Sequence, residues 1–239
     1  MDFIQKNSAR QNVGMMFDRI SRRYDFLNRL LSLRQDVRWR RRMSALLPDK
    51  NNLDILDLAA GTADVLVMLS RQNDKIRLGV GMDMATRMLA IGRRKISRLK
   101  SASILKLLPG DAAHLPFHND RFDAVTIAFG IRNFTDVDQA LDEIYTVLKA
   151  NGRLIVLEFS LPTNGAFKSF YLFYFRNILP FIGSVISGDP AAYRYLNRSV
   201  EAFPYGMAFC DLLKRHGFAD ITSHPLTFGI ATIYLGHKR

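Results

Sequence analysis

Along the first 50 residues, apolar positions recur at steps of three and four, which is the spacing of amphipathic helices. Three stretches follow this pattern: MMFDRISRRY, FLNRLLSL and DVRWRRRMSALL. The polar stretch LPDKNN then has the composition of a loop. The pattern therefore predicts a helical N-terminal cap over residues 1–50.

From residue 51 onward, short apolar runs alternate with segments of helical spacing. Strands are expected in LDILDLA, IRLGVGMD, SILKLLPGD, RFDAVTIAFG and GRLIVLEFS, and helices in ADVLVMLSRQ, MATRMLAIGRRKISRL and DVDQALDEIYTVLK. This alternation indicates a parallel sheet with right-handed crossovers. The last two runs, FADITSHPLTFG and IATIYLGHKR, suit an antiparallel hairpin at the sheet edge. Residues 51–239 are thus expected to form one α/β domain.

The most apolar stretch is FKSFYLFYFRNILPFIGSVI, residues 167–186. Its length approaches the roughly 20 residues that a membrane-spanning helix needs. Lys168, Arg176 and Asn177 interrupt it, however, and Pro180 breaks a helix. Two shorter helices fit better, either covering a pocket or lying on a membrane. They would belong to a helical insertion at about residues 165–215.

Composition limits the possible functions. A chain of 239 residues with 48% hydrophobic residues suits a single folded α/β domain. The lone cysteine, Cys210, excludes a disulfide framework and suits a reducing compartment, and we expect it in the core of a late helix. The start of the chain shows no pattern of a signal peptide. The five histidines show no metal-ligand spacing, so no metal is expected.

The formal net charge of +12 favours an anionic partner. Nine arginines against three aspartates lie between Phe17 and Arg42. This run is either a solvated helical face or a contact surface for the phosphates of lipid or nucleic acid.

The loop DLAAGTAD follows the first expected strand, where an open α/β sheet binds its ligand. A dinucleotide loop needs G-x-G-x-x-G to bring its backbone against a pyrophosphate. Only Gly61 is present, so a pyrophosphate cofactor is disfavoured. S-adenosylmethionine has no phosphate, and its pattern, acid-x-G-x-G-x-G, fits Asp57, Ala59, Gly61 and Ala63, provided that φ stays negative at the alanines.

Further polar residues fall at the other strand ends. Thr62 and Asp64 could accept from the ammonium group of the methionine part or cap the next helix. Asp83 ends the second strand and could accept both ribose hydroxyls. Asp111 and the Ala112 amide follow the third strand, where they could hold the adenine. Taken alone, the loop is equally an ordinary strand–turn–helix junction. Together these positions predict a cofactor site made of Asp57, Ala59, Gly61, Thr62, Asp64, Asp83, Met84, Asp111, Ala112 and Ala128.

Several stretches resemble the ubiquinone/menaquinone C-methyltransferase family (UbiE type). They are YDFLNRLLSLRQDVRWRR, DLAAGTAD, GMDMATRMLAIGRRK, GDAAHLPFHNDRFDAVTIAFGIRNF, LKANGRLIVLEFSLP and LPFIGSVISGDPAAYRYLNRSVEAFP. FGIRN and ISGDPAAYRYL are the most specific, because generic methyltransferases lack them. Ala60 and Ala63 depart from the family pattern, which usually has glycine there.

The resemblance implies a class I S-adenosylmethionine-dependent methyltransferase, with a Rossmann-like, mostly parallel seven-stranded sheet and an antiparallel C-terminal hairpin. It also implies C-methylation of a polyprenyl quinol, either demethylmenaquinol or a 2-polyprenyl-6-methoxy-benzoquinol, in respiratory quinone biosynthesis. Such an enzyme is expected in the cytoplasm, associated peripherally with the anionic inner membrane. A homo-oligomer or a complex of quinone-biosynthesis enzymes would be compatible with it.

A ring carbon is a poor nucleophile until a neighbouring phenol, with a pKa near 10, loses its proton. Arg132 and Asn133 follow the fourth strand, over the methyl group if the topology is right. Arginine stays protonated, so Arg132 would stabilise the phenolate or orient a water. Asn133 would fix the ring oxygen. Tyr24 and Asp25 could close the site, with Asp25 as a possible base.

Two other functions are weighed. The charge suggests an RNA methyltransferase, but FGIRN replaces the Asn/Asp-Pro-Pro-aromatic loop of base N-methylation, and Cys210 follows Phe209 rather than a proline. A nucleic-acid partner is therefore disfavoured. The alanines in the loop would also fit a non-catalytic protein that keeps the fold and has lost cofactor binding.

Overall fold

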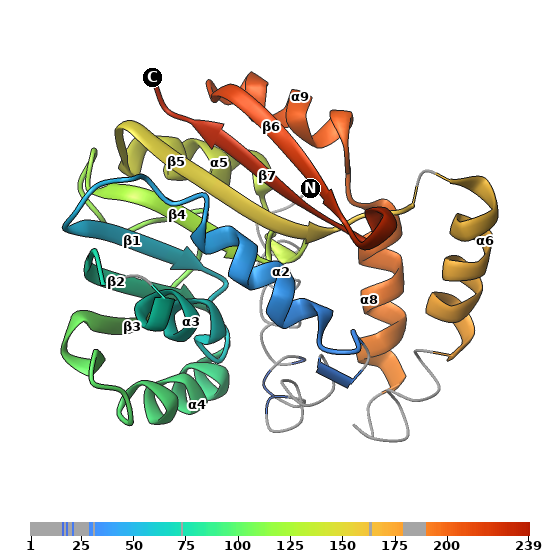
Figure 1. The fold of residues 1–239 in the computed structure, drawn as a ribbon, viewed down its shortest axis with the longest axis horizontal. Helices are drawn as coiled ribbons and strands as arrows, with labels where there is room; N and C mark the ends of the chain where they lie inside the picture. Colours follow the sequence, from blue (N-terminus) through green and yellow to red (C-terminus); the bar gives the residue numbers. More distant parts are fainter. Residues whose placement is uncertain are drawn as a thin grey trace.

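The structure is a computed structural model. It describes residues 32–72, 74–162, 164–178 and 190–239, with Met16, Asp18, Ser21, Arg29 and Leu30; side chains of the last range are described from residue 194. Seven strands form one sheet in the order β3-β2-β1-β4-β5-β7-β6 (Figure 1). Their bounds are β1 Leu53–Leu58, β2 Ile76–Asp83, β3 Leu105–Pro109, β4 Phe122–Ala128, β5 Leu148–Phe159, β6 Ala219–Leu226 and β7 Ala231–His237.

The first five strands pair in parallel, whereas β7 runs antiparallel to both β5 and β6. The predicted parallel sheet and C-terminal hairpin are confirmed. Every residue of β1 is buried, as expected for a central strand covered on both faces.

Helices cover both faces of the sheet. The helices are α2 Gln35–Ser44, α3 Asp64–Gln72, α4 Thr86–Ile96, α5 Val137–Val147, α6 Gly165–Phe173, α8 Pro190–Ala202 and α9 Met207–Arg215. Apolar side chains of α2 and α3 share one core cluster with β1, β4 and β5. Those of α5 and α9, Cys210 among them, fill the cluster on the other face.

The helices α6 and α8 lie beyond the end of the sheet toward which β1 points (Figure 1). Between them, α6 continues into a π-helical turn, Tyr174–Ile178. They share a separate apolar cluster built around Tyr171, Phe175 and Val200. The second helix expected within residues 167–186 falls on residues outside the described ranges. The two earlier N-terminal helices, 15–24 and 26–33, also lie mostly outside them.

Three short 3-10 helices complete the described chain: η1 Ala102–Ile104, η2 Ile131–Asn133 and η4 Thr227–Gly229. The η4 turn ends the strand predicted over residues 218–229 three residues early. Thr227, Phe228 and Gly229 all have positive φ, which an extended strand does not allow. The chain thus reverses between β6 and β7 through a helical turn.

Candidate active site

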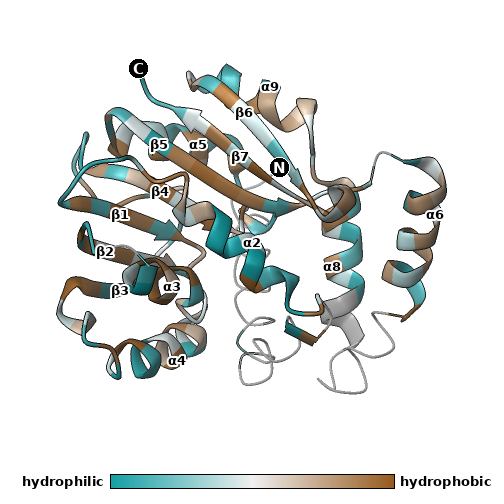
Figure 2. Ribbon diagram, in the orientation of Figure 1, coloured by the Kyte–Doolittle hydropathy of each residue, from teal (hydrophilic) through white to brown (hydrophobic). Residues whose placement is uncertain are grey.

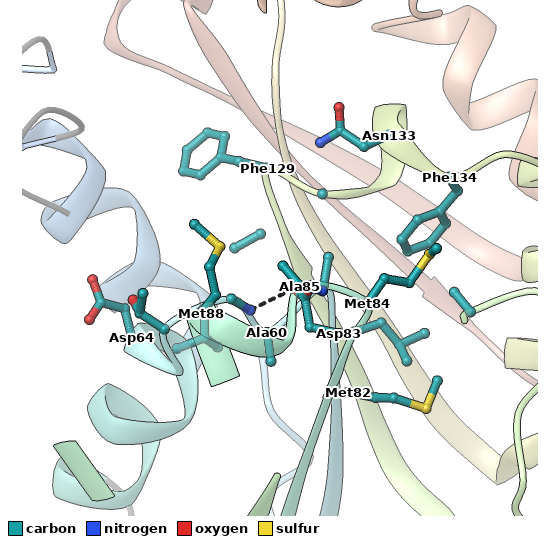
Figure 3. Close-up of a pocket in the computed structure, with 18 of the residues that line it drawn as sticks. Ala60, Asp64, Met82, Asp83, Met84, Ala85, Met88, Phe129, Asn133 and Phe134 are labelled. Atoms are coloured by element: carbon teal, nitrogen blue, oxygen red, sulfur yellow. Dashed lines mark hydrogen bonds between the residues drawn. The ribbon is translucent and has the colours of Figure 1, made fainter. Parts of the chain in front are cut away.

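A cleft opens at the carboxyl edge of the parallel strands, where the segments after β1, β2, β3 and β4 meet (Figure 3). Parallel strands end at one edge of a sheet, and loops beyond that edge form the ligand site of open α/β folds. Of the predicted cofactor set, the cleft brings together Ala59, Gly61, Thr62, Asp64, Asp83, Met84, Asp111, Ala112 and Ala128. Arg40 of α2 and the predicted catalytic residue Asn133 also line it.

The loop after β1 is held in left-handed backbone conformations. Gly61 has φ 53°, and Ala59 and Ala63 have φ 52° and 64°. The expectation that alanine stands only where φ is negative is therefore wrong at Ala59 and Ala63. An L-residue in this region costs roughly 1–2 kcal/mol, and tertiary contacts must offset it. One such contact runs from the Ala60 amide to the Met82 carbonyl of β2, at 3.1 Å.

Asp83 shapes this loop from the end of β2. Its Oδ2 accepts from the Gly61 amide and its Oδ1 from the Ala85 amide, each at 2.7 Å. Burial raises the pKa of Asp83, and these backbone hydrogen bonds act in the opposite direction. A carboxylate oxygen can accept more than one hydrogen bond. Asp83 can therefore hold the loop and still accept from a ligand in the cleft.

Thr62 and Asp64 already have a cationic partner, Lys95 of α4, which the sequence analysis missed. The Lys95 ammonium lies 2.8 Å from Thr62 Oγ1 and 2.6 Å from Asp64 Oδ1. Burial favours the neutral acid, but Lys95, Arg40 and Arg29 outweigh it and lower the pKa of Asp64. Lys95 thus makes the hydrogen bonds to Thr62 and Asp64 that were predicted for the ammonium group of a ligand.

Asp57 lies behind the loop and is not among the described residues that line the cleft. Its Oδ1 accepts from Thr126 Oγ1 at 2.7 Å. Burial raises the pKa of Asp57 to about 7, although the Thr126 hydrogen bond acts in the opposite direction. Its geometry is that of a group that braces β1 against β4.

Arg40 does not share the exposed position expected for the arginine-rich run. It is buried, bonds to Asp36 Oδ2 at 2.5 Å, and places its guanidinium 5.5 Å from the centre of the Phe129 ring. A surface contact with phosphates is therefore excluded for this arginine. Its position in the helix, between the buried Trp39 and Met43, follows from the three- and four-residue spacing of α2.

The neighbours Arg132 and Asn133 point to different partners. Arg132 Nη1 donates to the Phe129 carbonyl at 2.7 Å and to Glu158 Oε1 at 2.6 Å, and both side chains of this ion pair are almost fully buried. Asn133 faces the cleft, and its Oδ1 accepts from the hydroxyl of Tyr195 at 3.1 Å. The catalytic role of Arg132 stays a prediction. The predicted catalytic residues Tyr24 and Asp25 lie outside the described residues.

The apolar walls of the cleft were not predicted. Met82, Met88, Phe129 and Phe134 contribute them, from β2, α4 and the segment after β4 (Figure 3). Gly130 follows Phe129, and a Cβ at this position would lie 2.3 Å from the Cβ of Ala59. The loops after β1 and β4 therefore touch across the cleft floor.

These residues suit S-adenosylmethionine better than a dinucleotide. A pyrophosphate would sit at the N-terminus of α3, but Asp64 opens that helix and Asp83 lies beside it. Lys95 compensates the charge of Asp64, so the carboxylate that disfavours an anion and favours a cation such as a sulfonium is that of Asp83, which backbone amides hold. The apolar walls suit an adenine ring and a methionine chain, and Asp83 offers acceptors for ribose hydroxyls.

Several solved structures with a similar fold are described as methyltransferases. One is an S-adenosylmethionine-dependent methyltransferase of Thermotoga maritima, described as a possible histamine N-methyltransferase, with a TM-score of 0.67, 19% identity and coverage of 94% of this chain and 99% of its own. A phosphoethanolamine N-methyltransferase of Haemonchus contortus matches with a TM-score of 0.60 and 16% identity, over 85% of this chain and 52% of its own. The sheet order and these likenesses define the fold of the class I S-adenosylmethionine-dependent methyltransferases.

The family follows from the sequence comparisons. The model of the ubiE/COQ5 methyltransferase family matches residues 5–238. A demethylmenaquinone methyltransferase of Thermus thermophilus is 48% identical over 93% of this chain and all of its own length. A ubiquinone/menaquinone biosynthesis C-methyltransferase of Geobacter sulfurreducens is 44% identical over 95% of this chain and 89% of its own. The chain belongs to the ubiE/COQ5 methyltransferase family.

The described residues also bear on metal binding and on membrane-spanning helices. Among the described residues, no group of His, Cys, Asp and Glu could hold a metal ion. In the same parts of the chain, no helix combines the length and apolar character that crossing a membrane requires.

Proposed function

We propose that this protein transfers a methyl group from S-adenosylmethionine to a ring carbon of a polyprenyl quinol, with demethylmenaquinol as the ring. The observation that carries the proposal is the 48% identity, over 93% of the chain, to a protein named demethylmenaquinone methyltransferase. The geometry agrees with it, since an apolar cleft is bordered by one carboxamide, that of Asn133, at the end nearest the cap helices.

When bound, S-adenosylmethionine supplies an electrophilic methyl group and a positive charge beside the ring. In the transfer, the sulfur–methyl bond breaks, a carbon–carbon bond forms, and the ring carbon then loses its proton. Ionisation of the neighbouring phenol makes that carbon nucleophilic. Asn133, Phe129 and Phe134 line the cleft. In this proposal Asn133 hydrogen-bonds the phenolic oxygen, and the two aromatic rings keep water from the reacting carbon.

The test uses the purified full chain, methyl-labelled S-adenosylmethionine and short-tailed demethylmenaquinol. Mass spectrometry should show one added methyl group on the ring. A parallel reaction with a 2-polyprenyl-6-methoxy-benzoquinol decides whether the enzyme accepts both rings. If the protein binds S-adenosylmethionine in calorimetry and methylates neither quinol, the proposed substrate class is wrong. A failure to bind the cofactor would instead favour the non-catalytic alternative.

We also propose that the protein reaches this lipid substrate by binding an anionic membrane through a surface formed by α2, η4 and α6. Four arginines are exposed on α2 and at its N-cap: Arg34, Arg38, Arg41 and Arg42. Trp39 of α2 donates to Thr227 of η4 at 2.9 Å, which joins the two elements. Figure 2 shows that α2 is largely hydrophilic, whereas α6, on the other side of α8 in this view, is more apolar.

The apolar part of this surface consists of large exposed side chains. Phe228 of η4 is 81% exposed, and Phe170 and Phe173 of α6 are 70% and 59% exposed. The ring of Phe228 lies 5.3 Å from that of Phe167, which joins η4 to α6. Basic residues beside exposed aromatic rings suit shallow insertion into an anionic lipid surface, where each basic residue contributes about 1 kcal/mol.

Sedimentation with liposomes tests this surface. The protein should sediment with anionic vesicles at low salt and be released at high salt, whereas neutral vesicles should bind it less. Glutamine at Arg38, Arg41 and Arg42 should weaken binding. Glutamine at Arg94, Arg98 and Lys100, three exposed basic residues at the end of α4 and just after it, is a control with the same number of substitutions. If both sets weakened liposome binding equally, net charge would explain the binding and the proposed surface would be wrong.

A membrane-bound enzyme of this kind is expected at the cytoplasmic side of the inner membrane, and this location stays a prediction. Self-association and assembly with other quinone-biosynthesis enzymes also stay predictions.

A further inference from the structure

Among the described residues, a hydrogen bond joins helix α8 to the turn that borders the active-site cleft. The hydroxyl of Tyr195 donates to Asn133 Oδ1 at 3.1 Å, across 62 residues of sequence. Tyr195 also packs beside the apolar cluster formed by α6, α8 and the end of β5. Tyr195 thus joins α8 to the turn η2, which borders the cleft.

This hydrogen bond decides which end of the Asn133 carboxamide faces a ligand. A carboxamide has an acceptor oxygen and a donor nitrogen, and rotation by half a turn exchanges them. In Figure 3 the Asn133 oxygen points away from the loop after β1, and the nitrogen lies on the side of Phe129. With its oxygen engaged by Tyr195, Asn133 presents N–H donors to the cleft.

Donors at this position favour an ionised oxygen over a neutral hydroxyl, because hydrogen bonds to the charged form stabilise it. Among the described residues, the charged groups that act on Tyr195 are Arg132 and Glu158, which form an ion pair with each other. Burial raises the pKa of Tyr195, which keeps its hydroxyl a neutral donor, and Arg132 and Glu158 act on it in opposite directions.

We propose that Tyr195 is a positioning residue that holds Asn133 as a hydrogen-bond donor toward the phenolic oxygen that ionises during methyl transfer. This inference rests on the proposed quinol substrate. It also explains how α8 takes part in the chemistry. Its apolar side chains, together with Asn197 and Glu201, contact the segment 165–178. Through Tyr195, α8 must also pack on η2 for Asn133 to present its donors.

The test is a double-mutant cycle on turnover with Tyr195→Phe, Asn133→Ala and the combination of both. Tyr195→Phe should lower kcat by about 10-fold, the scale of one hydrogen bond. The affinity for S-adenosylmethionine should not change. The pH at half-maximal kcat should move upward, because the phenol then ionises less readily. Because Tyr195 acts through Asn133, the combined variant should be no slower than Asn133→Ala. Tyr205→Phe, in the same apolar cluster, is the matched control.

A second readout does not depend on turnover. A nitronaphthol bound in the cleft reports its own ionisation by absorbance, and its apparent pKa should be lower on the wild-type protein than on Tyr195→Phe. Equal probe pKa values, or effects of the two substitutions that add on kcat, would overturn the positioning role and leave Tyr195 as a packing residue. Failure of the wild type to methylate any quinol would overturn the proposed function instead, and the probe titration would then decide on Tyr195 by itself.

Discussion

Replacing Gly130 by alanine should damage the cofactor cleft for a purely steric reason. Gly130 has φ −114° and ψ −33°, which alanine also adopts, so no backbone strain is introduced. The new Cβ, however, would lie 2.3 Å from Ala59 Cβ, while its other neighbours, Ile127 Cγ2 and Ala59 Cα, lie at 3.5 and 3.7 Å. Only the Ala59 methyl group stands in the way.

The size of the effect follows from this contact. Overpacking of a dense site costs typically 1–3 kcal/mol, so Gly130→Ala should lower Tm by roughly 2–12 °C in a chain of this length. The Ala59 loop must move to relieve the contact, and the loop lines the cleft. We therefore expect the Kd for S-adenosylmethionine to rise by about 10-fold.

Glycine at Ala59 should rescue the variant. Ala59→Gly removes the obstructing methyl group and also relieves the left-handed φ of 52° at this residue. By itself it should change stability by no more than about 1 kcal/mol, since the greater freedom of glycine in the unfolded chain offsets the relief. A double-mutant cycle tests this: calorimetric titration with S-adenosylmethionine and thermal unfolding are measured on Gly130→Ala, on Ala59→Gly and on the double variant. A double variant as weak as Gly130→Ala alone would refute the steric argument.

Three further predictions concern buried carboxylates and their partners. Asp83→Ala should raise the Kd for S-adenosylmethionine at least about 10-fold, because the Gly61 and Ala85 amides and the ligand all lose the carboxylate that accepts their hydrogen bonds. Unchanged affinity in calorimetry would contradict this. Burial raises the pKa of Asp57 to about 7 in the folded chain, against about 3.9 in the unfolded chain. As pH rises from about 4 to about 7, the stability of the folded state should therefore decrease. Urea unfolding of Asp57→Asn should show a flatter pH profile, and parallel profiles would exclude the raised pKa. Arg132→Ala leaves Glu158 buried without its cation and should cost about 3–5 kcal/mol; a loss below 1 kcal/mol in the same assay would show that the pair is not buried in solution.

The pattern of the sequence was sufficient for most of the sheet. β1, β2 and β4 are short apolar runs, and turn or helical signals bound them on both sides. Such local periodicity is a property of neighbouring residues, so it survives without tertiary information. The strand-end positions of Asp83 and Asp111 followed from it as well, because parallel strands end at a common edge.

Contacts between distant residues were not accessible in the same way. Lys95 pairs with Asp64 across 31 residues, and Arg132 pairs with Glu158 across 26. Neither pair has a local spacing that would identify it. As a result, Asp64 and Arg132 were expected to meet the ligand, and the structure shows each of them bound to a residue of this chain.

By itself the sequence determined the succession of strands and helices along the chain. It also showed that the cofactor loop has a single glycine and that polar residues end the strands. The tertiary structure alone decided the backbone of Ala59 and Ala63, the burial of Arg40 and the orientation of Asn133 by Tyr195. The physical reason is that hydrophobic spacing encodes which face of an element is buried. Strained φ values and side-chain hydrogen bonds depend on which elements pack together. Their contributions to stability therefore arise only in the folded chain.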